Sequence, residues 1–168
     1  MTGSALLIVS STFQAAVMGV DELYFHRKRG LGRWERIGHP IDTLSVVACL
    51  VWVLTVPPSG PAAFGFITLS VFSCLLITKD EWVHARRCSA GEHWVHALLF
   101  LVHPVTLATL GLLWPLLHAA SGAPISWITA DRFLFVAVAG QLVVTIAFCA
   151  YQIVYWNLPW RRRESPGR

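Results

Sequence analysis

The sequence has little charge for its length. Only 13% of its 168 residues are charged, whereas a soluble domain of this size has about a quarter charged residues. Hydrophobic residues make up 55% of the chain, and the mean hydropathy is +0.59. This composition excludes an ordinary soluble domain and predicts an all-α integral membrane protein, because a backbone in lipid must satisfy its own hydrogen bonds.

Several motifs that carry chemistry are also absent. No Gly-rich phosphate-binding loop and no Ser nucleophile elbow occurs, and GLG at residues 30–32 is expected to be a turn. The four cysteines form no C-x-x-C motif. Three of them (Cys49, Cys74 and Cys149) fall within apolar blocks and Cys88 falls in a loop, so we expect no cysteine-based metal or redox site.

The apolar residues are grouped into five blocks, each close to the roughly 20 residues needed to cross a bilayer. The blocks cover about residues 4–25, 42–58, 62–83, 94–117 and 132–157. The first block lacks a basic start and a clear cleavage site, so we expect a membrane span there and not a signal peptide. We therefore predict a single polytopic membrane domain over residues 1–168, with five transmembrane helices.

The basic residues predict the orientation of these spans. Twelve of the 13 Lys and Arg residues fall on one side of the five-span arrangement, and only Arg132 falls on the other. Because basic loops stay in the cytoplasm, we expect the N-terminus outside and the C-terminus inside. The chain is then a multi-pass protein of the cytoplasmic membrane, and its net charge of +4 requires no nucleic-acid partner.

Most histidines and acids fall on the same, cytoplasmic side. They are His26, His39, His84, His93, His96 and His103, with Asp21, Glu22, Glu35, Asp42, Asp80, Glu81 and Glu92. Ionisable groups near lipid are costly unless they are paired, solvated or bound to a metal. Solvated pairing with nearby arginines (Arg27, Arg29, Arg86 and Arg87) is the alternative to a metal site.

Two segments of the chain have similar patterns. The first is DELYFHRKRGLGRWERIGHPID, residues 21–42, and the second is DEWVHARRCSAGEHWVHALLFLVHP, residues 80–104. Each begins with Asp-Glu, continues with His and a basic turn, and then has Glu-x-x-x-His where the next span begins. With a shift of one residue the segments correspond. We therefore predict two pseudo-repeated hairpins, residues 4–58 and 62–117, that form a four-helix core beside a fifth helix, residues 132–157.

Carboxylate and imidazole groups at these helix ends predict a metal site. Residues three or four apart share a helix face, and four-helix bundles hold two metal ions with inward Glu and His side chains, including a Glu-x-x-His element. The candidate ligands are Glu22, His26, His39, Asp80, Glu81, His84, Glu92 and His96. Additional ligands, or residues that orient ligands, are Asp42, His93 and His103. Two further acids, Asp21 and Glu35, are expected to cap helices or form ion pairs at the surface.

Polar residues also extend into the apolar spans. His103 lies seven residues after His96, on a similar helix face and about 10 Å deeper. It is either a deeper ligand or proton relay, or a buried side chain bonded to a carbonyl or hydroxyl group. A polar stripe in the last span is expected to pack against the four-helix core: Gln141, Thr145, Phe148, Gln152 and Tyr155.

The mixed ligand set narrows the choice of metal. Imidazole suits iron, zinc, copper or nickel better than magnesium or calcium. Several histidines together with three or four acids are typical of a non-haem di-iron environment. We therefore expect two transition-metal ions, with iron favoured and copper or zinc as alternatives.

The second segment resembles the metal-binding stretch of the C subunit of particulate methane and ammonia monooxygenases. In that stretch, Asp-x-x-x-His at one helix end is followed after a turn by His at the next helix start. Asp80, His84 and His96 match this order, with the last gap one residue short. Glu22, His26 and His39 match the spacing of the monooxygenase stretch, with Glu in place of Asp.

A looser resemblance is to the integral-membrane fatty-acid desaturases and hydroxylases. These enzymes gather histidines at the cytoplasmic ends of about four helices. Their H-x-x-H-H boxes are missing from this chain, in which HWVH at residues 93–96 is a partial match.

Three functions fit these expectations. The first is a membrane-embedded di-metal oxidoreductase that acts on a lipid or other apolar substrate at the cytoplasmic face, with electrons from a separate donor. The second is a zinc-dependent lipid hydrolase with Glu81 or Glu92 as general base. The third is a transition-metal binding or transport module. A haem site is disfavoured, because the cluster is rich in acids.

Overall fold

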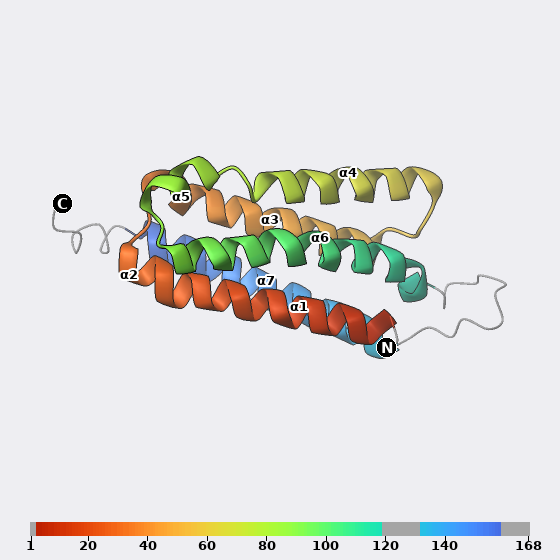
Figure 1. Cartoon of the computed structure of the whole chain (residues 1–168). Coiled ribbons are helices and arrows are strands. Elements are labelled where there is room, and N and C mark those ends of the chain that lie inside the picture. Colours follow the sequence, from red (N-terminus) through yellow and green to blue (C-terminus); the bar gives the residue numbers. More distant parts are fainter. Residues whose placement is uncertain (1–2, 119–131, 159–168) are drawn as a thin grey trace.

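The computed structural model describes residues 3–118 and 132–158 (Figure 1). All regular elements in these ranges are helices, which confirms the predicted all-α class for this part of the chain. In chain order they are α1 (Gly3–Val20), the π-helix η1 (Asp21–His26), α2 (Arg27–Arg29), α3 (Arg33–Thr55), α4 (Gly60–Leu76), α5 (Glu81–Arg87), α6 (Ala90–His118) and α7 (Arg132–Asn157). The basic tail and most of the loop before α7, on which the orientation argument partly depends, lie outside the described residues.

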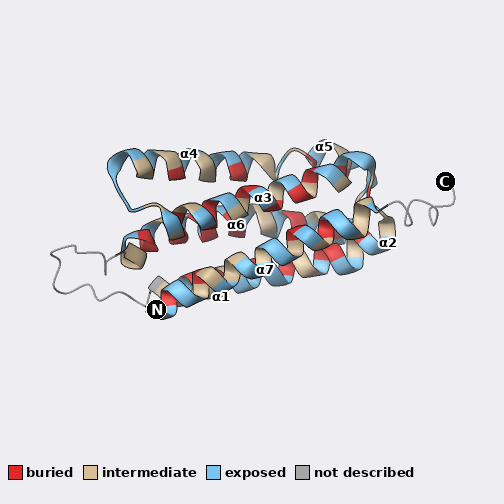
Figure 2. Cartoon of the chain, turned by 180° about the vertical axis from the view of Figure 1, so that it is seen from behind, coloured by how far each residue is buried: buried red, intermediate tan, exposed pale blue. Residues whose placement is uncertain are grey.

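Five helical stretches are long and apolar enough to cross a membrane, as the sequence predicts. They are Ser4–Arg29, Arg33–Thr55, Gly60–Arg87, Ala90–His118 and Phe133–Asn157. The second and fourth begin ahead of the predicted positions, 42 and 94, because the polar residues that precede the apolar blocks continue the helices. Large apolar side chains, such as Phe64 and Leu112, are exposed, as expected of a surface that faces lipid. Exposed residues recur along all the long helices (Figure 2).

The helices form one bundle in which neighbours in space are not always neighbours in sequence. α1 packs mainly against α6, and α3 lies between α4 and α7 (Figures 1 and 2). α6 also contacts α3 and α4, so α3 and α6 are central to the bundle. The fifth helix is therefore integrated through α3, and its Gln152 accepts a hydrogen bond from the Thr43 hydroxyl at 2.7 Å.

The apolar core and the polar residues are separated along the bundle. Leu50, Val53, Phe66, Leu110 and Trp114 pack together in one half. The indole nitrogen of Trp114 donates a hydrogen bond to the Val56 carbonyl, 2.8 Å away, which ties α6 to the end of α3. The other half holds the buried acids and histidines, so the apolar half fixes the helices between which the polar residues are placed.

Local backbone features shape the polar end. Gly30 has a φ of 77°, a left-handed conformation that favours glycine, and it ends α2 before the turn into α3. Glu35 then accepts a hydrogen bond from the Gly32 amide at 2.9 Å, which caps α3. Pro40 lies inside α3 and removes one helical hydrogen bond; the carbonyl of Arg36, four residues earlier, instead accepts from Asn157 Nδ2 at 3.2 Å.

The π-helix explains a one-residue offset at the start of the two similar segments. Asp21 and His26 are five residues apart, whereas Asp80 and His84, the corresponding pair, are four apart. A π-turn accommodates one more residue than an α-turn, and such turns are frequent at functional sites. The extra residue is therefore absorbed in η1, and Asp21 and His26 still approach to 3.2 Å.

Candidate metal centre

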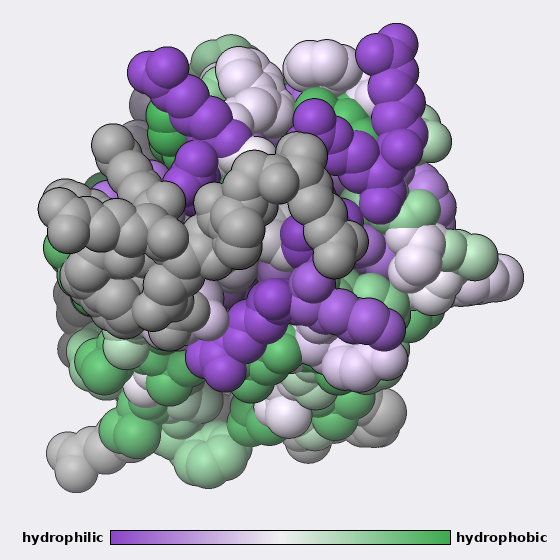
Figure 3. All heavy atoms as spheres, turned by 90° about the vertical axis from the view of Figure 1, so that its left-hand side faces the viewer, coloured by the Kyte–Doolittle hydropathy of each residue, from purple (hydrophilic) through white to green (hydrophobic). Residues whose placement is uncertain are grey.

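The polar half of the bundle ends in a face rich in hydrophilic residues, near α2 and α5 (Figure 3). Beneath this face lies a cluster of buried acids and histidines from η1, α3, α5 and α6. The sequence predicts this convergence, and the structure brings seven of the eight candidate ligands together: Glu22, His26, His39, Asp80, His84, Glu92 and His96. We use the term metal cluster for these seven with Asp21 and Glu35.

Four imidazole rings form the centre of the metal cluster. His26 and His39 are stacked, with ring centroids 4.7 Å apart. The rings of His84 and His96 lie 4.2 Å apart, and those of His26 and His96 lie 6.4 Å apart. His26, His84 and His96 are buried, and His39 is mostly buried. Four imidazoles packed this closely cannot all carry a proton without strong repulsion, so they require neighbouring carboxylates or a metal ion.

The carboxylates contact histidines of the opposite hairpin. Asp21, in the first hairpin, places Oδ1 3.2 Å from Nε2 of His96. Asp80, in the second, places Oδ2 3.6 Å from Nε2 of His39. Because Asp21 corresponds to Asp80 and His96 to His39, exchanging the two segments converts one contact into the other.

A second pair of contacts has the same relation. Glu35 Oε1 lies 3.4 Å from Nε2 of His84, and Glu92 Oε1 lies 3.9 Å from Nε2 of His26. Direct contact within one helix occurs in η1, where His26 lies 3.2 Å from both Asp21 and Glu22. The acids of the metal cluster other than Glu22 contact histidines of the opposite hairpin.

Glu22 departs from this two-fold arrangement. Its Oε1 accepts a hydrogen bond from the indole nitrogen of Trp156 at 2.5 Å, and its Oε2 faces His26. The corresponding acid, Glu81, is 47% exposed and lies 3.8 Å from the partly exposed His93. The fifth helix, which has no counterpart in the repeat, thus supplies the partner that holds Glu22 inside.

Two cationic side chains partly neutralise the metal cluster. Arg29 contacts both Glu35, at 2.6 Å, and Glu92, at 3.0 Å. Lys79 contacts Asp80 at 3.0 Å and also Asp42 at 2.5 Å. Six carboxylates, those of the metal cluster and Asp42, therefore face two cations. If the imidazoles are neutral, four negative charges remain. Two divalent metal ions would balance them.

Several buried polar atoms of the metal cluster have no hydrogen-bond partner. They are Nε2 of His26, Oδ1 of Asp80, Nδ1 and Nε2 of His84, and Nδ1 of His96. A buried polar atom without a partner costs on the order of 1–3 kcal/mol, and natural structures contain few of them. Their convergence is therefore the feature of this site that most needs a ligand.

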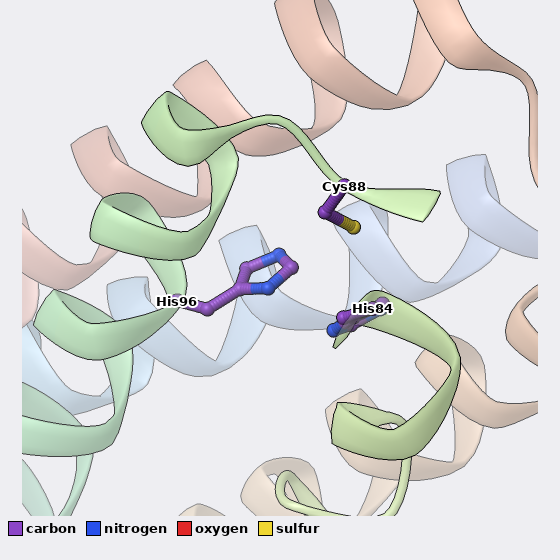
Figure 4. A group of neighbouring side chains, drawn as sticks. All are labelled: His84, Cys88 and His96. Carbon is purple, nitrogen blue, oxygen red and sulfur yellow. The ribbon is translucent and has the colours of Figure 1, made fainter. Parts of the chain in front are cut away.

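Four groups of residues have ligand atoms that all lie within 4.8 Å of one another. The groups are Asp21, His26, Glu92 and His96; His39, Asp80 and His84; Glu22, His26 and His39; and His84, Cys88 and His96 (Figure 4). The first two share no residue and together use each of the four histidines once. The donor set therefore fits two separate transition-metal ions, one with two carboxylates and two imidazoles and one with one carboxylate and two imidazoles.

Three residues important to this geometry were not among the sequence candidates. Glu35 caps α3 and pairs with Arg29, as expected. Asp21 and Glu35 are nevertheless buried in contact with histidines, so their expected place at the surface is wrong. The sequence signal for Asp21 is that an Asp-Glu pair begins each of the two similar segments. The signal for Glu35 is its Glu-x-x-x-His spacing, which Glu92 shares. The third, Cys88, joins the group of His84 and His96. Burial raises the pKa of its thiol to about 12, so a metal must displace its proton.

The structure places the remaining candidates at the margin of the metal cluster. Glu81 and His93 are partly exposed and face each other. Asp42 is held by Lys79, which also holds Asp80, so Asp42 acts on the metal cluster through a shared cation. His103 lies deeper in the bundle: Gln14 Nε2 is 2.9 Å from its Nδ1, and Ser73 Oγ is 3.0 Å from its Nε2.

A cavity of about 930 Å³ leads from the metal cluster into the bundle. Its walls come mainly from α1 and α7, with smaller parts from α3 and α6, and are largely apolar, with Ile8, Phe100 and Val144 among the lining residues. His26, His39, Asp80, His84 and His96 line its polar end. The predicted polar stripe of α7 faces the same cavity through Gln141, Thr145 and Gln152.

Comparisons with family models, with curated proteins and with solved structures find no match for this chain. The metal cluster is therefore interpreted from its own residues and geometry.

Proposed function

We propose that this protein is a membrane-embedded di-metal oxidoreductase that acts on a lipid or other apolar substrate. The observation that carries the proposal is the buried ring of four imidazoles and five carboxylates with unpaired donor atoms. An ion-pair network alone would leave an excess of four negative charges with neutral imidazoles, and buried charge is costly unless it is paired. Two divalent ions would satisfy both the charge and the unpaired atoms.

Iron is the favoured metal, with copper or zinc as alternatives. One ion would be held by Asp21, His26, Glu92 and His96, and the other by His39, Asp80 and His84. The second set has two histidines and one carboxylate, the ligand composition of many non-haem iron oxygenases. When bound, such a pair of ions would supply oxygen activation, with electrons delivered by a separate donor protein.

The protein's own residues would orient and neutralise this centre. Arg29 holds Glu35 and Glu92 in fixed positions by charge-assisted hydrogen bonds, and Lys79 does the same for Asp80. Trp156 fixes one oxygen of Glu22, so that the other faces His26. Such partners of metal ligands typically matter by 10–100-fold in metal affinity or activity.

The cavity supports an apolar substrate. Its volume, about 930 Å³, falls in the range of small-molecule sites, and its walls are mostly apolar. Gln14 also lines the cavity, and its buried amide has one hydrogen bond to His103 and an unpaired Oε1. A chain-like molecule that enters between helices from the bilayer would contact apolar side chains along its length and bring one end to the metal cluster.

The same proposal places the metal cluster on the cytoplasmic side of the inner membrane. The described basic residues of the loops and helix ends lie at the end of the bundle that holds it: Arg27, Lys28, Arg29, Arg33, Arg36, Lys79, Arg86 and Arg87. By the positive-inside rule this end faces the cytoplasm, where a soluble electron donor can reach it. Accessibility of single introduced cysteines to a membrane-impermeant reagent would test this orientation.

Elemental analysis of the detergent-purified protein tests the function first. We expect about two iron ions per chain in the native protein and their loss in the double variant His84→Ala/His96→Ala, with His93→Ala as a control that retains them. Oxygen consumption with added lipid and a one-electron donor then tests the activity. Zinc in place of iron would redirect the assay to hydrolysis of lipid esters and amides. Absence of any transition metal after reconstitution would overturn the proposal.

A further inference from the structure

A further group of candidate metal ligands, which contains a thiol, lies at the turn between α5 and α6. Cys88 opens this turn, and its amide donates a hydrogen bond to the His84 carbonyl at 2.9 Å, which holds the cysteine above the end of α5. The side chains of His84, Cys88 and His96 converge there (Figure 4). Their ligand atoms, two nitrogens and one sulfur, lie within 4.8 Å of one another.

The donor atoms of this group are available. Both ring nitrogens of His84 and Nδ1 of His96 are buried without a hydrogen-bond partner, and both side chains are more than nine-tenths buried. His96 uses its other nitrogen, Nε2, to face Asp21 of the metal cluster. An imidazole with one nitrogen toward the inner carboxylates and one unpaired is suited to passing an ion from an outer to an inner position.

The chemistry of this group differs from that of the inner groups. The inner groups combine imidazole with carboxylate, whereas this group combines imidazole with a thiol and contains no acid. Soft thiolate ligands favour Zn²⁺, Cu⁺ and similar ions over Mg²⁺ and Ca²⁺. Cys88 is also less buried than the two histidines, so it lies on the side from which an ion would arrive.

We propose that Cys88, His84 and His96 form an outer loading position, where a transition-metal ion binds before it moves to the buried centre. The inference rests on the proposed function, because His84 and His96 are ligands of that centre too. Binding breaks the S–H bond of Cys88 and forms a metal–sulfur bond; the proton goes to solvent and no electron is transferred. Since the two histidines are shared, filling the inner positions draws the ion inward, and occupancy of the outer position is transient.

Titration of the metal-free, detergent-purified protein with Co²⁺ tests this proposal. A thiolate-to-cobalt charge-transfer absorption should appear with the first equivalent and decay as the ion moves inward. It should be absent in Cys88→Ser and unchanged in Cys74→Ser, a control cysteine in α4. We expect loading of the inner positions to slow by at least about tenfold in Cys88→Ser, since even partners of metal ligands typically matter by 10–100-fold.

A second measurement uses the native chain, so that its result does not depend on whether a variant folds. A short pulse of alkylating reagent, given before the thiolate absorption decays, should find Cys88 protected by Co²⁺ and Cys74 unprotected, as read by mass spectrometry of the two peptides. Binding of about two cobalt ions with no thiolate absorption and no protection of Cys88 would overturn the loading position and leave the buried centre intact. Failure to bind cobalt at all would overturn both proposals.

Discussion

The carboxylate of Asp80 lies 3.6 Å from the imidazole of His39, which belongs to the other hairpin. Asp80 is 2% exposed, whereas its neighbour in sequence, Glu81, is 47% exposed and points away from the metal cluster. Both acids are candidate metal ligands by their spacing in the sequence, but the fold buries one and exposes the other. The pair therefore offers a matched test of which carboxylates belong to the site.

We expect Asp80→Asn to remove about one of two bound metal ions, because the amide loses the charge that balances the ion. Glu81→Gln should leave the metal content unchanged, since its side chain is solvated. Metal analysis of both variants, purified alongside the native chain, measures the difference. Equal losses in the two variants would contradict the assignment of Asp80 as the ligand.

Equivalent histidines of the two hairpins should behave alike. His39 and His96 occupy corresponding positions, and each faces an acid of the opposite hairpin. We therefore expect His39→Ala and His96→Ala to reduce the metal content to a similar extent, and each to weaken binding by 10-fold or more, on the order of the losses seen near metal sites. Calorimetric titration with the reconstituting metal measures both the number of ions bound and the affinity. If only one of the two variants loses metal, the two corresponding histidines do not contribute equally to metal binding, which contradicts the prediction.

Arg29 should stabilise the fold as well as the metal cluster. Its guanidinium pairs with Glu35 and Glu92, both of which are buried. Removing one partner of a buried ion pair typically costs about 3–5 kcal/mol, because the other charge remains uncompensated. We expect Arg29→Gln to lower the unfolding temperature of the metal-free protein clearly, and Arg33→Gln, at an exposed position, to have little effect. Thermal unfolding in detergent, followed by helical circular dichroism, makes the comparison.

Filling the cavity should block the substrate and spare the metal. Ala137 lines the cavity, whereas the half-buried Ala139, two residues later in α7, does not. We expect Ala137→Trp to reduce lipid-dependent oxygen consumption at least about tenfold, because displacement of a substrate by ~1 Å can cost 100-fold in rate. Ala139→Trp should retain both activity and metal. Loss of metal in Ala137→Trp would show that the change disturbs the centre itself.

The close contact between α4 and α6 gives a prediction about the apolar half. A Cβ atom added at Gly111 would lie 2.6 Å from Cε1 of Phe66, a buried ring that packs near Trp114. We expect Gly111→Ala to destabilise the protein by about 1–3 kcal/mol, as overpacking does. At Gly140 an added Cβ meets nothing within 4 Å, so Gly140→Ala should be neutral or stabilise by up to about 1 kcal/mol. Chemical unfolding in detergent distinguishes the two.

Composition and periodicity were sufficient to predict the helices. Apolar blocks of about 20 residues have one stable backbone form in lipid, so five such blocks predict five helices without knowledge of packing. The convergence of His26, His39, His84 and His96 was also predictable. Consecutive spans run in opposite directions, and all four histidines fall on the same side of the predicted five-span arrangement. The repeat of Asp-Glu and Glu-x-x-x-His further indicated which of these residues correspond.

The partners within the site depended on the tertiary structure. A sequence gives the face that residues such as Glu92 and His96 share on α6, and it does not give the helix toward which that face points. Packing of α1 and α3 against α6 turned these faces toward one another, so that acids contact histidines of the opposite hairpin. The same packing buried Asp21 and Glu35, exposed Glu81, and brought Trp156 from the fifth helix to Glu22.

The sequence by itself thus determined that the chain is helical, suited to a membrane, and polar at one end, since these properties follow from local hydrophobicity and backbone hydrogen bonding. Only the tertiary structure decided which oxygen, nitrogen and sulfur atoms share a site. The grouping of Cys88 with two histidines depends on the turn between α5 and α6 and on how closely α5 and α6 approach. Distances of this kind arise from packing across helices, which spacing along the chain does not encode.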